Sequence, residues 1–133
     1  MWLASVQLSA PAFVLPGRIA VSTTLGGLGL IFAITGMVAF RNAMTTFNPM
    51  QPGAASVLVT SGAYRLSRNP MYVGLLLTLG GWAVFLSHML AFLFLPAFVA
   101  YMNRFQISPE EEALSSKFGK EFAAYKQSVR RWL

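Results

Sequence analysis

The side chains of this sequence that could do chemistry gather in two short polar segments, each beside a long apolar run. The first is TSGAYRLSRNPMYVG at residues 60–74, and the second is the run of three Glu at residues 110–112. Ionisable groups are costly in a membrane and are usually kept there for a function. Guanidinium groups suit the binding of carboxylates, and a Glu suits the binding of hydroxyl groups. We therefore expect the functional site of the protein in these two segments.

The same residues also have a purely structural interpretation. Arg and Lys beside membrane spans set the orientation of the chain in the bilayer. Glu at the start of a helix interacts favourably with the helix dipole. Composition alone fits both interpretations.

The composition predicts one integral membrane domain. The chain has 133 residues, 56% of them hydrophobic and only 11% charged, against about 25% charged in a typical soluble domain. The net charge of +6 is assigned to topology and anionic membrane lipids, and not to nucleic acid, because no basic run with interleaved aromatic residues occurs. The chain has no Cys and one His, His88, so we expect no disulfide, no thiolate nucleophile and no metal site.

The apolar runs predict an all-α membrane protein. An uncharged run of about 20 residues can span a bilayer. Residues 69–103 carry no charge, but as one helix they would be about 52 Å long, so we divide them into two short spans that turn near residues 87–88. We predict three transmembrane helices, a short N-terminal apolar helix and a C-terminal amphipathic interfacial helix. The segments are a partial helix at 1–17, a span at 19–40, a loop at 42–59, the motif at 60–70, a hairpin of spans at 71–87 and 90–105, and the amphipathic helix at 109–129.

Small residues form two stripes on the predicted spans. Such stripes let helices approach closely in a membrane. We expect them to pack spans of one chain together, and a homodimer interface is the alternative use. The stripes are Ser22, Gly26, Gly29, Ala33 and Gly36 on the first span, and Gly74, Thr78 and Gly81 on the second.

The segment 109–129 has an amphipathic pattern in which apolar residues recur every three or four positions. Successive helical residues point about 100° apart, so the three Glu cannot share one role. We expect Glu111 on the buried face, Glu110 on its flank and Glu112 pointing away. Gly119 is expected to permit a close approach and not to break the helix. The apolar positions are Leu114, Phe118, Phe122, Tyr125 and Val129.

The distribution of Arg and Lys predicts the topology. Two Arg precede the hairpin and most of the remaining basic residues follow it. The positive-inside rule therefore places both ends of the hairpin and the C-terminus in the cytoplasm. Because the hairpin returns the chain to its starting side, we expect Arg68, Asn69 and Tyr72 beside Arg104, Glu110 and Glu111.

These residues resemble a known family. GAYRLSRNPMYVG at 62–74 is similar to the GPYRxxR(H/N)PxYxG motif of isoprenylcysteine carboxyl methyltransferase-like membrane proteins, and the segment from Glu110 to Tyr125 is similar to their EExxLxxxFGxxYxxY. Phospholipid methyltransferases share a related pattern. The likeness covers about residues 45–133. Ala63 replaces the usual Pro, Asn69 stands where many members have His, Phe122 replaces a Tyr, and members usually have a complete span where residues 1–16 stand.

The resemblance implies an S-adenosylmethionine-dependent methyltransferase with no metal. Its acceptor would be a lipophilic small molecule, carrying a carboxylate or an amine, that reaches the site from the bilayer. The catalytic residues would be Arg104 and Glu111. The cofactor-binding residues would be Tyr64, Arg68, Asn69, Pro70, Tyr72, Gly74, Glu110, Glu111, Phe118 and Tyr125.

Two alternatives remain on the sequence alone. One is an NADPH-dependent membrane reductase, because sterol reductases resemble this fold and share a similar Arg-His-Pro element. The sequence has no added basic cluster for a 2′-phosphate, and Asn69 weakens that match. The other is a membrane protein without enzymatic activity.

Overall fold

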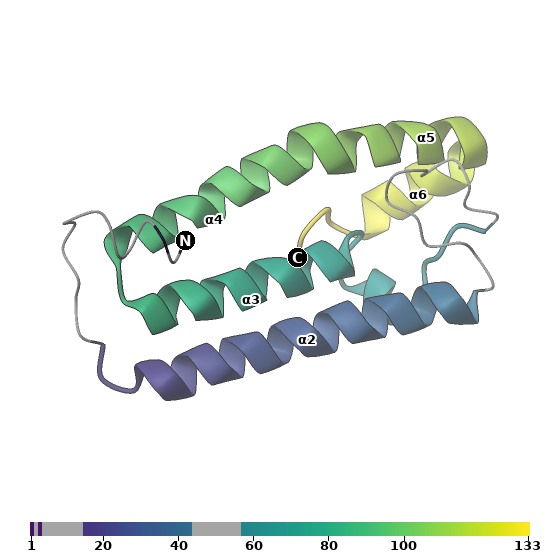
Figure 1. Ribbon diagram of the computed structural model, residues 1–133. Helices are drawn as coiled ribbons and strands as arrows, with labels where there is room; N and C mark the ends of the chain where they lie inside the picture. Colours follow the sequence, from purple (N-terminus) through teal and green to yellow (C-terminus); the bar gives the residue numbers. More distant parts are fainter. Residues whose placement is uncertain (2, 4–14, 44–56) are drawn as a thin grey trace.

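The computed structural model describes residues 1, 3, 15–43 and 57–133, and all the regular secondary structure in them is helical. No strand occurs in these residues, in agreement with the predicted all-α class. Most of the predicted segments 1–17 and 42–59 lies outside them. In chain order the elements are α2 (Arg18–Asn42), the 3₁₀-helix η2 (Gly62–Arg65), α3 (Pro70–Leu86), α4 (Met89–Tyr101), the π-helix η3 (Met102–Ile107), α5 (Ser108–Phe118) and α6 (Lys120–Ser128) (Figure 1).

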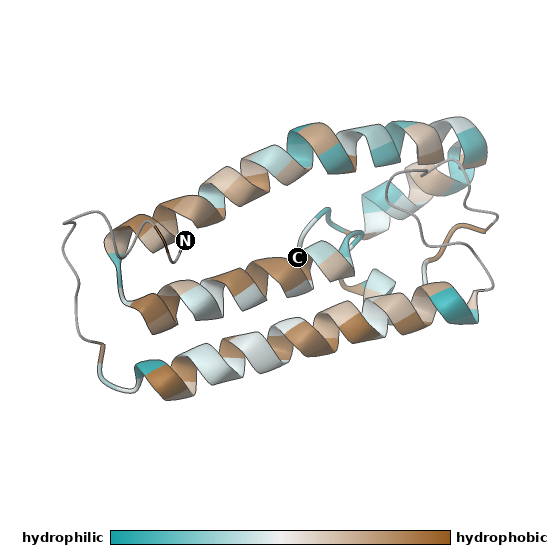
Figure 2. Cartoon of the chain, viewed as in Figure 1, coloured by the Kyte–Doolittle hydropathy of each residue, from teal (hydrophilic) through white to brown (hydrophobic). Residues whose placement is uncertain are grey.

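Two helices are long and apolar enough to cross a membrane. They are α2 and the continuous helix that runs through α4, η3 and α5, Met89–Phe118. α3 is apolar but has 17 residues, which is shorter than that length. Figure 2 shows that apolar residues dominate α3 and α4, whereas polar residues gather on α5 and α6. The polar segments of the sequence therefore lie together at one end of an apolar bundle.

α2 and α3 pack backbone against backbone through the two predicted stripes. A Cβ placed on Gly74 would lie 2.5 Å from the carbonyl oxygen of Gly29, and one placed on Gly81 would lie 2.7 Å from that of Ser22. Any side chain at these positions would separate the helices, so glycine is required there. The stripes thus contact each other inside one chain, which is the first of the two uses expected of them.

The hairpin turns at Ser87 and His88. Ser87 follows the last residue of α3 with a left-handed backbone, φ 48°, and α4 begins directly after His88. Both residues are buried. α3 itself begins at Pro70, whose fixed φ suits the first turn of a helix.

The helix that begins the second hairpin span does not end near residue 105 but continues into α5 without a break. The continuation passes through η3, a π-helical stretch that ends two residues before Pro109. A proline inside an α-helix removes a backbone donor and crowds the carbonyl four residues earlier. A π-helical turn changes the hydrogen-bond register at this point, and the Ser108 hydroxyl donates to the Asn103 carbonyl at 2.6 Å.

The predicted single amphipathic helix at 109–129 is wrong, because the chain breaks at Gly119. Gly119 has φ 51° and separates α5 from α6. Apart from its neighbours in the chain, no described residue lies within 4 Å of the place where its Cβ would be, so no described helix approaches it closely. Glycine is suited to this position by its positive φ. The break lets α6 turn back from the end of α5 (Figure 1).

The main buried core lies where α6 meets the end of α2 and the segment around η2. Its buried members are Ala39, Leu58, Val59, Tyr64, Phe122 and Tyr125. Phe118 and Leu114 of α5 pack against it. This core holds α6 in place, and with it the residues that follow, which reach the polar segments.

Candidate functional site

The carboxylate of Glu111 is held by two arginines that are distant from it in the sequence. Arg68 Nη1 donates to Glu111 Oε1 at 2.8 Å. Arg131 forms a two-point contact, with Nη2 at 2.6 Å from Oε2 and Nε at 3.1 Å from Oε1. Glu111 is 9% exposed. Hydrogen bonds between charged groups with this fork geometry are among the strongest in proteins.

Glu110 binds a different pair of residues. The Tyr72 hydroxyl donates to Glu110 Oε1 at 2.6 Å, and Gln106 Nε2 donates to the same oxygen at 2.9 Å. Glu110 is half-buried and Glu112 is exposed. The expected orientations of the three Glu, with Glu111 buried, Glu110 on the flank and Glu112 pointing away, are therefore observed.

The hairpin brings residues of the two polar segments into direct contact. Arg68 lies just before α3 and Tyr72 lies in the first turn of α3, and their partners Glu111 and Glu110 come from the first turn of α5. Arg68 is only 13% exposed at its side chain. Its Nε atom is buried and has no hydrogen-bond partner among the described residues. A buried donor without a partner is costly, so this atom marks a place where a ligand could accept a hydrogen bond.

Residues 129–133, which we call the clasp, cover the same cluster. The carbonyl oxygen of Arg131 accepts a hydrogen bond from Asn69 Nδ2 at 2.9 Å. Asn69 therefore binds the clasp in this structure. Sequence reasoning missed Arg131, and also Ser67, Asn103 and Gln106, which bind the clasp or Glu110. The only signal for Arg131 was the basic end of the chain.

Five of the residues predicted to bind the cofactor make packing contacts instead of joining the charged cluster. Tyr64, Phe118 and Tyr125 belong to the core between α6 and η2, and the Tyr125 hydroxyl donates to the Tyr64 carbonyl oxygen at 2.7 Å. Burial raises the pKa of both phenols, so both stay neutral. Pro70 begins α3, and Gly74 faces α2.

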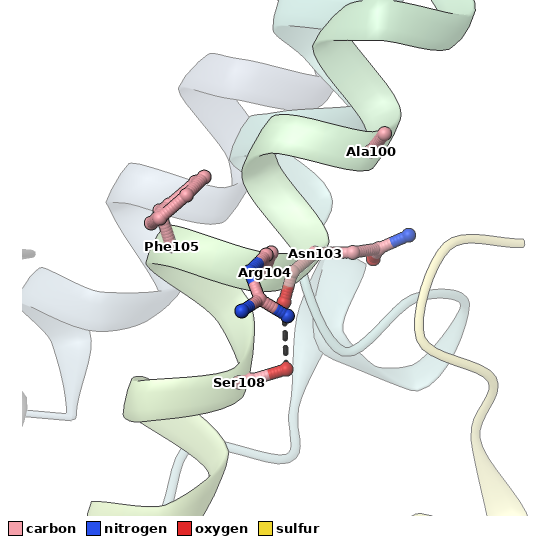
Figure 3. A pocket seen from close by; sticks show the side chains of 5 residues that line it. All are labelled: Ala100, Asn103, Arg104, Phe105 and Ser108. Carbon is pink, nitrogen blue, oxygen red and sulfur yellow. Dashed lines mark hydrogen bonds between the residues drawn. The ribbon is translucent and has the colours of Figure 1, made fainter.

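Arg104 also lies apart from the charged cluster. Its guanidinium stands over the Phe105 ring, 5.8 Å from the centroid. Arg104 lines an open hollow with a volume of about 460 Å³, together with Asn103, Phe105, Ser108 and Ala100. Figure 3 shows these side chains on η3 and the adjoining turns, and Figure 2 shows that the helix changes from apolar to polar along its length. The hollow is therefore at the border between the apolar and polar parts of this helix.

Comparison with known proteins identifies the family. Residues 17–121, which include both polar segments, match the phospholipid methyltransferase family. The chain belongs to the phospholipid methyltransferase family. A protein of Haemophilus influenzae described as an uncharacterized protein is 51% identical over 63 residues, which are 47% of this chain and 100% of that protein. No solved structure gives a significant match.

Membership of the phospholipid methyltransferase family confirms the resemblance seen in the sequence and accounts for the site at a coarse level. The family is one of methyltransferases, and two helices of the chain can span a bilayer. The family and the apolar helices together indicate a membrane methyltransferase. The polar cluster lies at the open end of the apolar hairpin.

Proposed function

We propose that this protein transfers a methyl group from S-adenosylmethionine to a lipophilic acceptor that carries a carboxylate or an amine. The observation that carries the proposal is the joining of Arg68, Tyr72, Glu110 and Glu111 in one partly buried cluster. These side chains come from the two segments that resemble methyltransferase motifs. Methyl transfer from a sulfonium needs in-line positioning more than acid catalysis, because the leaving thioether is neutral.

The residues of the cluster fit the chemical groups of the cofactor. S-adenosylmethionine presents a carboxylate, a ribose diol, a purine and a sulfonium cation, and when bound it supplies an activated methyl group. Arg68 would bind the carboxylate, because its buried Nε lacks a partner among the described residues. Glu110 would accept hydrogen bonds from the ribose hydroxyls through the oxygen that does not bind Tyr72. Tyr72 offers an aromatic ring to the sulfonium or the purine.

The other residues of the cluster would act by orienting these groups. Glu111 fixes the guanidinium of Arg68 through a 2.8 Å ion pair. The Tyr72 hydroxyl fixes the carboxylate of Glu110. We propose that Glu111 orients Arg68 and that Glu110 is the carboxylate available to the cofactor. This differs from the sequence-based expectation, in which Glu111 was a catalytic residue.

The acceptor would approach from the side of α4. Arg104, Asn103 and Ser108 line the open hollow at the border of the apolar part of the helix. A lipophilic molecule in the bilayer could place its polar group in this hollow while its apolar part stays in the membrane. Arg104 would bind an anionic group of the acceptor there, and membrane lipids would surround the apolar helices. The positive-inside rule supports a cytoplasmic site.

The experiment is calorimetric titration of the purified protein in nanodiscs with S-adenosylhomocysteine, with NADPH as the comparison ligand. We expect S-adenosylhomocysteine to bind and NADPH not to bind. Arg68→Ala should weaken binding by about 2 kcal/mol, because it removes a hydrogen bond to a charged group. Binding of NADPH alone would favour a reductase, and binding of neither ligand would favour a protein without this activity.

A second experiment tests the side of the membrane. A reporter fused after residue 133 should read as cytoplasmic, because the basic residues flank both ends of the hairpin on that side. A reporter at the opposite side would place the polar cluster away from the cytoplasm. That result would contradict the proposal that the site takes its cofactor from the cytoplasm.

A further inference from the structure

We propose that the clasp, residues 129–133, sets the distance between the two halves of the site, and that Arg131 is a positioning residue for Glu111. The inference rests on the proposed function for the identity of the ligand. The family match ends at residue 121, so the clasp lies outside the residues that this match covers. Its role is therefore argued from its contacts alone.

The backbone of the clasp is attached to the segment that precedes α3. The Arg68 amide donates to the Arg130 carbonyl oxygen at 2.9 Å. The Arg131 carbonyl oxygen accepts from Asn69 Nδ2 at 2.9 Å and from the Ser67 hydroxyl at 3.3 Å. Residues 67–69 therefore bind the carbonyl groups of residues 130 and 131. Ser67 is completely buried at this contact. Bonds that involve the backbone of both segments leave little freedom for either to shift.

The side chains of the clasp are attached to the opposite helix. Arg131 holds both oxygens of Glu111 on α5. The Trp132 indole nitrogen donates to Asn103 Oδ1 on η3 at 3.1 Å. One short segment thus binds the start of α3 through its backbone and the α5 and η3 part of the long helix through its side chains. It forms a bridge between the two halves of the candidate site.

The site needs such a bridge because its halves make few other contacts at this end. α3 packs closely along α2 but has no extensive packing against α5. Side chains link this region to α5 through the pairs Arg68–Glu111, from just before α3, and Tyr72–Glu110, from the first turn of α3. Pairs of long side chains hold a distance poorly, because ordering both of them costs conformational entropy. The clasp adds bonds that are anchored in the backbone.

The chemistry of Arg131 suits a positioning role. A guanidinium binds a carboxylate at two points and fixes its orientation, whereas an ammonium acts as a point charge. The Arg131 fork therefore fixes the plane of the Glu111 carboxylate. That carboxylate in turn binds Arg68 Nη1, so the position of Arg68 depends on Arg131.

The test uses the full chain and four proteins: the wild type, Arg131→Ala, Arg131→Lys and Arg130→Ala. Arg130 is the matched control, because its side chain is exposed and the clasp uses only its carbonyl group. The first readout is calorimetric affinity for S-adenosylhomocysteine in nanodiscs. We expect Arg131→Ala to weaken binding by about 10- to 100-fold, Arg131→Lys to weaken it less, and Arg130→Ala to leave it unchanged.

The second readout needs no ligand. The chain has no Cys, so two introduced cysteines at the exposed positions Leu66 and Ser115 can carry spin labels. Pulsed electron paramagnetic resonance would then measure the distance between the segment before α3 and α5. We expect a narrow distance distribution in the wild-type and Arg130→Ala backgrounds, and a broader one with Arg131→Ala.

The two readouts separate the inference from the proposed function. If the wild type does not bind S-adenosylhomocysteine, the proposed function fails, and the distance distributions alone decide whether the clasp positions the two halves. If the wild type binds and Arg131→Ala changes neither affinity nor distance distribution, the inference is wrong. Tighter binding by Arg131→Ala would also overturn it, because the clasp would then be a cover that competes with the ligand.

Discussion

Helix α3 is held by its two neighbours in opposite ways. Against α2 the contact is made by backbone atoms, and a Cβ on Gly74 would lie 2.5 Å from the oxygen of Gly29. Against α5 the contact is made by long polar side chains, Tyr72 of α3 to Glu110 and Arg68, just before α3, to Glu111. The first contact leaves no room for change, whereas the second can exchange a protein partner for a ligand.

The two contacts of α3 have different roles, one in stability and one in ligand binding. Close packing of small residues stabilises helix pairs inside a bilayer, where apolar surface gains little from association. Polar side chains at the end of the bundle can rearrange at a smaller cost. One of them, Arg68, has an Nε–H group that donates to no described residue. The α2–α3 pair is thus the scaffold, and the space between α3 and α5 is the candidate site.

The largest effect that would test this division is expected from Glu111→Gln. Removing one partner of a buried ion pair leaves an uncompensated charge, which costs about 3 kcal/mol or more. Here two arginines would lose their counter-ion, so both the free energy of unfolding and the affinity for S-adenosylhomocysteine should fall. Denaturant unfolding in detergent and calorimetry would measure the two effects.

Glu112→Gln is the control for Glu111→Gln, because Glu112 is exposed and adjoins Glu111 in the sequence. It should be nearly silent in both measurements. Equal and small effects of the two substitutions would mean that the Glu run only stabilises the start of α5 through the helix dipole.

A smaller effect is expected from Gly74→Ala, which acts on the other contact of α3. The added methyl group meets backbone atoms of α2, so the helices must move apart, at a cost of about 1–3 kcal/mol. Gly80→Ala, in the same helix, has nothing within 4 Å of the new Cβ and should not destabilise the protein. Thermal unfolding in detergent compares the two variants, and equal midpoints would contradict the scaffold role of the α2–α3 contact.

The smallest effect is expected from Tyr72→Phe. The substitution removes the 2.6 Å hydrogen bond to Glu110 and keeps the ring, so the α2–α3 scaffold should be unaffected. Affinity for S-adenosylhomocysteine should fall by about 1 kcal/mol, because the Glu110 carboxylate loses a hydrogen bond that orients it. A loss of stability without any loss of affinity would assign Tyr72 to the scaffold instead of the site.

The sequence by itself determined the features that depend on local pattern. The small-residue stripes predicted close packing between spans of one chain, because spacing along a helix decides which residues share a face. The apolar period and the 100° step between helical residues predicted which Glu is buried. The motifs at residues 62–74 and 110–125 identified the family. Each of these inferences needs only the residues within one or two helices.

The tertiary structure decided the features that depend on how segments meet. At Gly119 the last helix breaks, and α6 turns back so that Phe122 packs in the core with Tyr64. Residue type alone does not distinguish a glycine at such a break from a glycine at a close contact. Tyr125, placed by its motif near the cofactor, is buried in that core. Arg131 lies 20 residues from Glu111, and no periodicity relates two residues across a reversal of the chain. Only the packing of α6 brings Arg131 to the Glu111 carboxylate, and with it the proposed control of the distance between the two halves of the site.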